Sequence, residues 1–276
     1  MPVSGPTVVR RQLGRRLRNL REKAGKTERE VEDAKLVSRT KLWRIESGKV
    51  PVKVPDVRAL CWFYGADAET TDALANLAVG TAGQGWWEDY GDVVPDWFKL
   101  YVGLEGVATR IQSYDGELVP GPLQTEDYTR AVYRAARPDD SECREEIERH
   151  VALRRQRQEA LLRRDQPPTL QFVLSAGAVL RQVGGPEVMA AQVEQLRHFN
   201  RLDHVEITVI PLEAGAHAAM LGAFSILEFS ESDDPDVVYF ETQAGARYLE
   251  KYSEIQEYRR IFELIHRQAV PIEEYP

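Results

Sequence analysis

Cysteine is scarce in this chain, and the residues that bind metals are scattered along it. Its 276 residues include two cysteines, Cys61 and Cys143, which lie far apart without the spacing of a metal site. Isolated cysteines of this kind are typical of reduced thiols in a cytoplasmic protein. The histidines show no H-x-x-x-H or H-E-x-x-H spacing; they are His150, His198, His204, His217 and His266. We therefore expect no bound metal.

Long apolar runs are missing as well. No stretch approaches the roughly 20 apolar residues that cross a bilayer. The first residues, MPVSGPTVVRRQLGRR, are basic but contain no apolar segment, so they do not resemble a secretory signal. With 43% hydrophobic and 29% charged residues, the composition is that of a soluble globular protein. We expect a cytoplasmic protein with no membrane partner.

The sequence also lacks the motifs of common enzymes. No serine lies in a G-x-S-x-G elbow, and Cys143 lies in a charged segment with no base beside it. The pair Gly184-Gly185 matches neither a P-loop nor a dinucleotide fingerprint. We expect neither an enzyme nor a cofactor.

Charge is distributed unevenly along the chain. Residues 1–60 hold 16 Lys and Arg against 7 Asp and Glu, a net charge of +9, whereas the remainder holds 20 against 37, a net charge of −17. A basic head favours contact with phosphate, and an acidic body disfavours it. The overall net charge of −8 therefore does not exclude DNA binding by the head.

Residues 25–48, GKTEREVEDAKLVSRTKLWRIESG, have the pattern of two short helices joined by a tight turn. Thr27 and Glu30 have the spacing of a capping box, and Ser38 suits the start of the second helix. In that helix Leu42 and Ile45 are three residues apart and are expected to face inward. The pattern predicts a helix-turn-helix whose second helix lies in the major groove.

Basic and polar side chains remain on the outside of this second helix. Its first residues are expected to meet base edges, while Arg44 either assists them or holds the fold by pairing near Glu46. Basic residues around the motif are expected to hold phosphates, which position the protein without specifying sequence. The predicted DNA-binding residues are Arg10, Arg11, Thr27, Ser38, Arg39, Thr40, Lys41, Arg44, Lys49 and Lys53.

Helices are also predicted on either side of the motif. Leu13, Leu17, Leu20 and Ala24 form one face of a helix over residues 8–24, with its arginines, Arg21 among them, on the other faces. After the motif, Asp56 begins another helix. Its expected inner face is Val57, Leu60, Cys61 and Tyr64, and Gly65 ends it.

These segments resemble the Cro/XRE class of bacterial helix-turn-helix regulators over about residues 8–65. The resemblance is carried by LGRRLRNLREKAGKTEREV and SRTKLWRIESGKV. The chain departs from the class at three places in the motif. Glu28 replaces a Gln that usually contacts phosphate, Glu32 replaces a small residue, and Lys35-Leu36 replaces Leu-Gly. The resemblance implies a DNA-binding head over residues 1–68.

Beyond a helical linker at residues 69–84, strand and helix patterns alternate over residues 85–276. Four or five short alternating strands with interspersed helices predict a larger mixed α+β domain after the all-α head. Residues 141–165 contain seven arginines interleaved with acids. RNA binding is one interpretation of this segment, and a solvated charged helix with i, i+4 pairs is the favoured one.

An aromatic cluster opens this second region. Trp86, Trp87, Trp97 and Phe98 could line a ligand pocket or a partner interface, or could simply dock the segment in a core, which is the favoured reading. His217 is the histidine in a loop, EAGAH, suggestive of a site. We name these five residues as tentative partner- or ligand-binding residues.

The second region resembles an uncharacterised C-terminal domain that follows Cro/XRE heads in many actinobacterial regulators. The similarity covers about residues 85–270 and is carried by WWEDY, LVPGPLQTEDYTRAV, VGGPEVMAAQVEQL, IPLEAGAH and DPDVVYFET. Ser175 and Ala176 replace an acidic pair common in that domain. The resemblance implies an antitoxin-like regulator beside a small companion protein.

Two hypotheses follow. The first is a sequence-specific transcriptional regulator that binds pseudo-palindromic DNA as a homodimer, with a C-terminal domain that senses a small protein or a ligand. The alternative is an antitoxin-like interaction protein whose main role is to bind a small companion encoded nearby.

Overall fold

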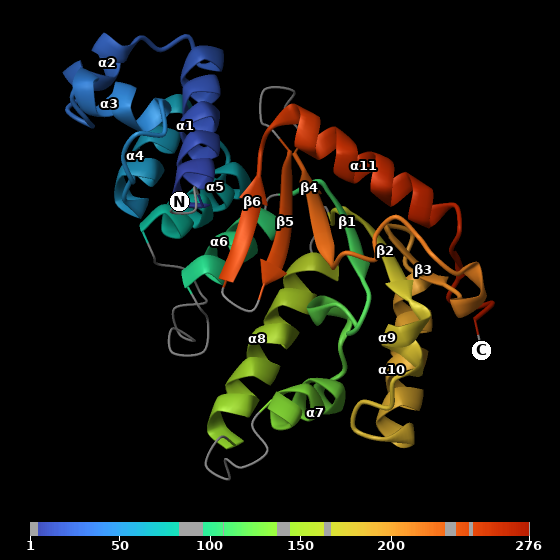
Figure 1. Ribbon diagram of the computed structural model, residues 1–276. Helices are drawn as coiled ribbons and strands as arrows, with labels where there is room; N and C mark the ends of the chain where they lie inside the picture. The colour runs from blue at the N-terminus through green and yellow to red at the C-terminus, as the bar shows by residue number, and fades with distance from the viewer. Residues whose placement is uncertain are drawn as a thin grey trace. The chain divides into compact units, whose positions relative to one another are not determined.

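The computed structural model describes residues 5–82, 96–106, 108–136, 144–162, 167–229, 236–242 and 245–275. These residues form two compact units. The first contains helices α1 to α6, and the second contains all later elements (Figure 1). This arrangement confirms the predicted fold class, an all-α helix-turn-helix head followed by a mixed α+β domain.

The first unit is entirely helical in its described part. Its core is formed by the inner faces of α1, α3, α4 and α5, on which Leu17, Leu42, Leu60 and Leu77 are completely buried. The predicted inner face of the fourth helix is confirmed, because all four of its residues are buried. The helices are α1 Gly5–Lys23, α2 Glu28–Asp33, α3 Arg39–Glu46, α4 Val54–Tyr64, α5 Ala68–Ala82 and α6 Asp96–Glu105.

Helices α1 and α3 approach each other closely at Gly14. A Cβ on Gly14 would overlap the carbonyl oxygen of Ile45 and lie 2.8 Å from that of Glu46. Only glycine therefore allows the backbones to meet at this point. The contact fixes α3 against the longest helix of the head.

The second unit is built on a seven-stranded mixed sheet with strand order β6-β5-β4-β1-β2-β3-β7. The central strands β1, β2 and β3 run parallel, and β4 joins β1 in antiparallel register. The strands are β1 Arg110–Asp115, β2 Thr169–Ser175, β3 Val205–Ile210, β4 Phe224–Glu228, β5 Val237–Thr242, β6 Gly245–Leu249 and β7 Val270–Pro271.

Helices cover both faces of the sheet. One face packs on α11 Tyr252–His266, where Phe262 and Ile265 meet Tyr114, Val173 and Ile226. The helices between the parallel strands lie on the other side of the sheet (Figure 1). They are α7 Glu126–Ala136, α8 Arg144–Leu162, α9 Ala176–Leu180 and α10 Pro186–Asn200, with a short 3-10 turn, η2 Gly121–Leu123, before α7.

Helix α8 differs from the solvated helix that its charge pattern favoured. It buries Ile147, Val151, Leu153 and Leu161, and Arg157 is only 4% exposed. Packing against α7 and η2 outweighs the local charge pattern, because the apolar residues between the arginines need cover. The pattern of residues 248–269 predicts a final helix. The helix is confirmed as α11, but its predicted start is wrong, because Tyr248 pairs with Tyr239 of β5 as part of β6.

Candidate nucleic-acid interface

Helix α3 separates its apolar and polar residues as the sequence predicted. Leu42 and Ile45 are 0% and 1% exposed, which confirms that they face inward. Arg39, Thr40, Lys41 and Arg44 are all exposed. The outer side of α3 therefore offers guanidinium, ammonium and hydroxyl donors, the groups that read base edges in a major groove.

The start of α3 is fixed by two side chains. The Lys41 backbone N–H donates to the Ser38 hydroxyl at 3.3 Å, as expected for an N-cap. The Arg39 backbone N–H donates to the Glu32 carboxylate at 3.1 Å. Glu32 thus satisfies an amide that helix geometry leaves free, and its negative charge suits a helix N-terminus. This role of Glu32 was not predicted from the sequence.

Helix α2 begins with the predicted capping box. The Glu30 N–H donates to the Thr27 hydroxyl at 3.2 Å, and the Thr27 N–H donates to the Glu30 carboxylate at 2.8 Å. The Thr27 hydroxyl also donates to the Glu30 carboxylate, at 2.9 Å, and the backbone and hydroxyl donors of Thr27 together lower the pKa of Glu30. Thr27 and Ser38 therefore cap the starts of the two helices of the motif.

The turn between α2 and α3 closes around Lys35, the one non-glycine residue with positive φ among the described residues, at 57°. Its N–H donates to the Glu32 carbonyl at 2.8 Å, and the Leu36 N–H donates to the Val31 carbonyl at 3.4 Å. A side chain in this left-handed conformation costs about 1–2 kcal/mol. The turn nevertheless buries Val37, so the motif closes despite its departure from the Leu-Gly pattern.

Glu46 at the end of α3 forms a buried ion pair with Arg21 of α1. Arg21 Nε and Nη2 donate to the two Glu46 oxygens at 2.7 and 2.9 Å, and Nη1 donates to the Lys26 carbonyl at 3.0 Å. The bond to Glu46 is the main cause of a raised pKa at Arg21. The prediction that Arg21 lies on an outer face is wrong. The sequence did indicate the inner face, because Arg21 follows the inward-facing Leu17 by four residues and so lies on the same side of the helix.

The pairing role considered for Arg44 belongs to Arg21. In the part of the chain that the structure describes, the exposed Arg44 guanidinium has no carboxylate partner. It therefore remains available to an external anion.

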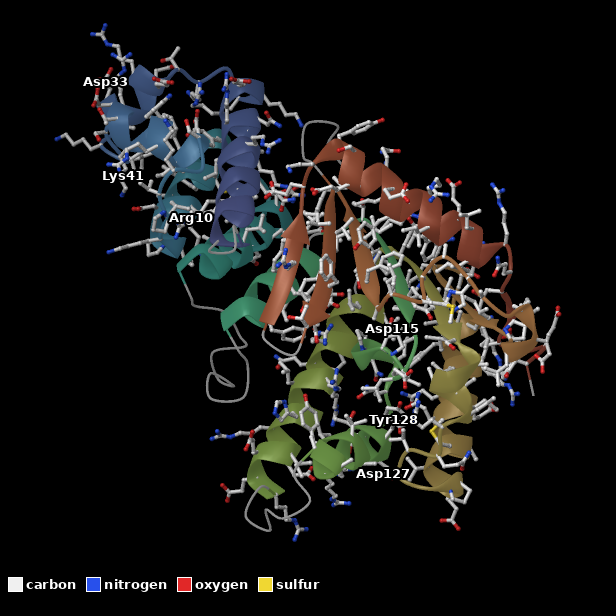
Figure 2. The ribbon with its side chains drawn as sticks, viewed as in Figure 1. Arg10, Asp33, Lys41, Asp115, Asp127 and Tyr128 are labelled. Carbon is white, nitrogen blue, oxygen red and sulfur yellow. The ribbon has the colours of Figure 1, made fainter. Side chains whose placement is uncertain are left out.

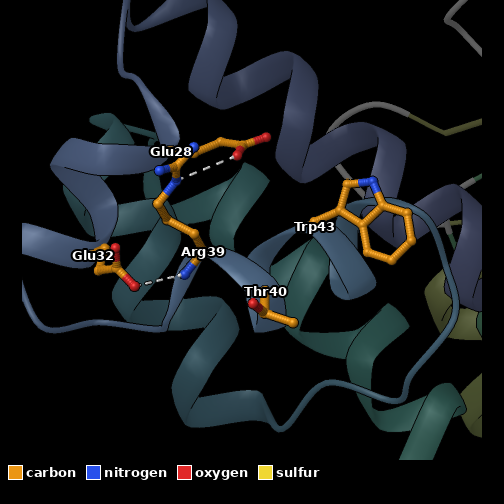
Figure 3. Close-up of a pocket in the computed structure, with 5 residues that line it drawn as sticks. All are labelled: Glu28, Glu32, Arg39, Thr40 and Trp43. Carbon is orange, nitrogen blue, oxygen red and sulfur yellow. Dashed lines mark hydrogen bonds and ion pairs between the residues drawn. The ribbon is translucent and has the colours of Figure 1, made fainter.

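Two carboxylates from α2 lie beside the first residue of α3. Arg39 Nε is 4.0 Å from a Glu28 oxygen, and Glu32 accepts from the Arg39 backbone (Figure 3). These residues line a hollow with Thr40 and the half-exposed Trp43. The hollow combines a cation, acceptors and an aromatic ring, which are the groups that contact base edges.

The predicted phosphate-binding residues differ in what surrounds them. Lys49 Nζ lies 4.0 Å from the centre of the Trp43 ring, and Lys53 is exposed just before α4. Lys41, which is predicted to meet base edges instead, is paired with Asp56 at 2.7 Å. Arg10 is partly buried, and the side chain of Arg11 lies outside the described residues. DNA contacts by these residues stay predictions.

The tentative ligand residues are described only in part. Trp86, Trp87 and the side chain of Trp97 lie outside the described residues. Phe98 stacks on Tyr101 within α6, with ring centres 5.6 Å apart.

His217 is in the loop after β3. Its Nδ1 accepts from the Ala219 N–H at 3.3 Å, and its Nε2 lies 3.3 Å from the Tyr114 hydroxyl. Burial lowers the pKa of His217, which favours the neutral ring. These bonds anchor the loop to β1.

The described residues contain no cluster of three or more His, Cys, Asp or Glu suited to a metal ion. None of their helices combines the length and apolarity needed to span a membrane. Cys61 is a free, buried thiol whose pKa burial raises to about 11, whereas Cys143 is outside the described part.

Comparison with known proteins divides the chain along the same lines. Residues 12–74 match the family described as a helix-turn-helix domain, which indicates a DNA-binding regulator. Residues 98–274 match the family described as a domain of unknown function, DUF5753. No curated protein and no solved structure matches.

Proposed function

Since the chain belongs to the DUF5753 family and carries a helix-turn-helix domain, we propose that it is a sequence-specific DNA-binding transcriptional regulator. The observation that carries the proposal is the outer face of α3. There Arg39, Thr40 and Arg44 are exposed on a helix whose start and inner face are both fixed. A rigid helix with exposed donors is what base reading in the major groove requires.

The proposed division of labour follows from position. Arg39, Thr40 and Lys41 at the start of α3 read base edges, with Arg44 one turn later. Arg10, Arg11, Lys49 and Lys53 hold phosphates. Losing a base contact should cost about 1–3 kcal/mol at one position of the site, whereas losing a phosphate contact weakens binding to all sequences alike.

We further propose that two copies bind a pseudo-palindromic operator. Paired helix-turn-helix domains contact half-sites about 34–36 Å apart, one turn of the double helix. The second unit then supplies dimer contacts and a sensing function through a small protein or a ligand. The chain acts by binding and not by catalysis, in keeping with the lack of catalytic motifs in the sequence.

The antitoxin-like alternative rests on the resemblance to actinobacterial regulators that have a small companion. Copurification of a neighbouring gene product with the full chain, together with no sequence preference on DNA, would favour it. Specific, salt-sensitive binding to DNA by the chain alone favours the autonomous regulator.

The deciding experiment selects bound sequences from a random DNA pool and then measures affinity by fluorescence anisotropy. Arg39→Ala and Arg44→Ala should each reduce affinity about 5- to 150-fold and relax preference at one position of each half-site. Arg58→Ala is the matched control, because Arg58 is an exposed arginine of α4 already paired with Asp72 at 2.7 Å. Unchanged affinity and preference in both α3 variants would overturn the proposal.

A further inference from the structure

The hollow between α2 and α3 carries more acid than base. It is lined by Glu28 and Glu32 of α2 and by Arg39, Thr40 and Trp43 of α3 (Figure 3). Two carboxylates against one guanidinium give these five residues a formal net charge of −1. The phosphates are the charged groups of DNA, so a negative hollow on the outer face of α3 disfavours them. The edges of the bases carry no net charge and meet no such repulsion.

The backbone donors at the start of α3 are also occupied. The Arg39 N–H donates to the Glu32 carboxylate at 3.1 Å, and the Lys41 N–H donates to the Ser38 hydroxyl at 3.3 Å. Free amides at a helix N-terminus commonly bind phosphate. Here two of them bind side chains of the same motif, and Glu32 adds a negative charge beside them. The first turn of α3 therefore offers fewer backbone donors to a phosphate.

Arg39 is the cation of the hollow, and one edge of its guanidinium faces Glu28. Its Nε lies 4.0 Å from Glu28 Oε2, and the two side chains remain 60% and 37% exposed. Within the described ranges, Arg39 Nη1 and Nη2 have no hydrogen-bond partner. A guanidinium fork of this kind donates to O6 and N7 of guanine in the major groove. Glu28 thus lies on one edge of the guanidinium and leaves the fork exposed.

An arginine without a neighbouring acid would have a competing target on DNA. Phosphate oxygens accept from the same fork, and contacts to phosphate carry no sequence information. Glu28 opposes that contact, because its carboxylate attracts the guanidinium and repels an approaching phosphate. The ion pair is exposed, so its attraction is weak. Glu28 therefore biases the direction of Arg39 without fixing it.

We propose that Glu28 is a positioning residue, which directs Arg39 to a guanine and keeps it from the phosphates. A guanine then faces Arg39 in each half-site of the operator, and Glu28 itself contacts no base. The inference rests on the proposed function, because it requires α3 to lie in the major groove. It goes further by naming the base that Arg39 reads and the residue that makes the reading selective.

The first test uses the unchanged full chain and its selected operator. Each guanine of one half-site is replaced in turn by 7-deazaguanine, which lacks the N7 acceptor, and affinity is measured by fluorescence anisotropy. One of these replacements should weaken binding by the unchanged chain about fivefold or more. The same replacement should leave the affinity of Arg39→Ala unchanged, which identifies the guanine that Arg39 contacts.

The second test compares Glu28→Ala with the unchanged chain on that operator over a series of salt concentrations. The preference for guanine at the identified position should fall about two- to fivefold, as expected for an exposed ion pair. The slope of the logarithm of the binding constant against that of salt concentration should steepen by about 0.9, because Arg39 then neutralises one phosphate. A residue that only supported the fold would not steepen this slope.

Asp33→Ala is the matched control. Asp33 ends α2 (Figure 2), is exposed and lies 3.8 Å from Arg29, so the change removes one paired acid from the same helix without altering the hollow. It should leave the guanine preference unchanged. A double-mutant cycle then connects both effects to Arg39. In an Arg39→Ala background, Glu28→Ala should change neither the base preference nor the salt slope.

The outcomes separate this inference from the proposed function. A full chain without any sequence preference would overturn the proposed function itself. If Arg39→Ala relaxes the preference while Glu28→Ala keeps the preference and salt slope of the unchanged chain, the positioning role alone is overturned. If no 7-deazaguanine replacement acts through Arg39, guanine is the wrong base.

Discussion

The buried pair between Arg21 and Glu46 should determine whether α3 stays attached to the head. Arg21→Met removes the cation and leaves the Glu46 carboxylate, 8% exposed, without its partner. Three hydrogen bonds are lost, two to Glu46 and one to the Lys26 carbonyl. Breaking one half of a buried pair costs about 3–5 kcal/mol. In a unit of about 100 residues each kcal/mol shifts Tm by roughly 4–8 °C, so the head should melt at least about 12 °C lower.

The assay is urea and thermal unfolding of the full chain, followed by the helical circular dichroism signal. Arg18→Met is the control on the same helix, because Arg18 is exposed and paired with Glu22 at 2.8 Å. That change should cost no more than about 1 kcal/mol. The double variant Arg21→Met/Glu46→Leu should recover most of the loss, since no buried charge is left unpaired.

DNA binding separates this structural role from base reading. Well below its Tm, Arg21→Met should keep its sequence preference and lose affinity only as far as the head unfolds. If Arg21→Met cost no more than Arg18→Met, or if the double variant were as unstable as the single one, the assigned role of the pair would be refuted.

Three further changes test other contacts. Gly14→Ala should destabilise the head by about 1–3 kcal/mol in urea unfolding, because its methyl group would overlap the Ile45 carbonyl; an unchanged midpoint would contradict the close approach. Glu28→Gln should raise DNA affinity several-fold in anisotropy titrations, because it frees Arg39 and removes a charge worth about 1 kcal/mol at 4 Å in water; weaker binding would instead indicate that Glu28 contacts a base. Asp115 has a pKa raised from 3.8 to about 7, so the folded state holds a proton that the unfolded state releases, and stability should fall as pH rises from 4 to 7. Asp115→Asn should flatten that decline by roughly 2–4 kcal/mol in unfolding followed against pH, and an unchanged pH profile would exclude Asp115 as its source.

Local patterns in the sequence determined the helix-turn-helix almost completely. The capping box at Thr27, the cap at Ser38 and the inward faces of α3 and α4 all depend on residues within about one or two helical turns. Gly65, predicted to stop α4, has a φ of 74° in the left-handed region. The alternating segments that became β1 to β5 were recognised for the same reason, since a period of two is visible without knowing the neighbours.

Tertiary structure decided the features that depend on distant partners. β6 exists because Tyr248 pairs with Tyr239 across a turn, although the local pattern continued a helix. Arg21 is buried because Glu46, 25 residues away, neutralises it, and Glu32 caps a helix that begins seven residues later. Arg154 and Arg157 of α8 converge on Gly121, which lies more than 30 residues earlier in the chain. Gly121 and α8 both belong to the connection between the parallel strands β1 and β2, and the path of that connection brings them together. Burial of a charge is decided by the whole set of neighbours in space, and a linear pattern records only those nearby in the chain.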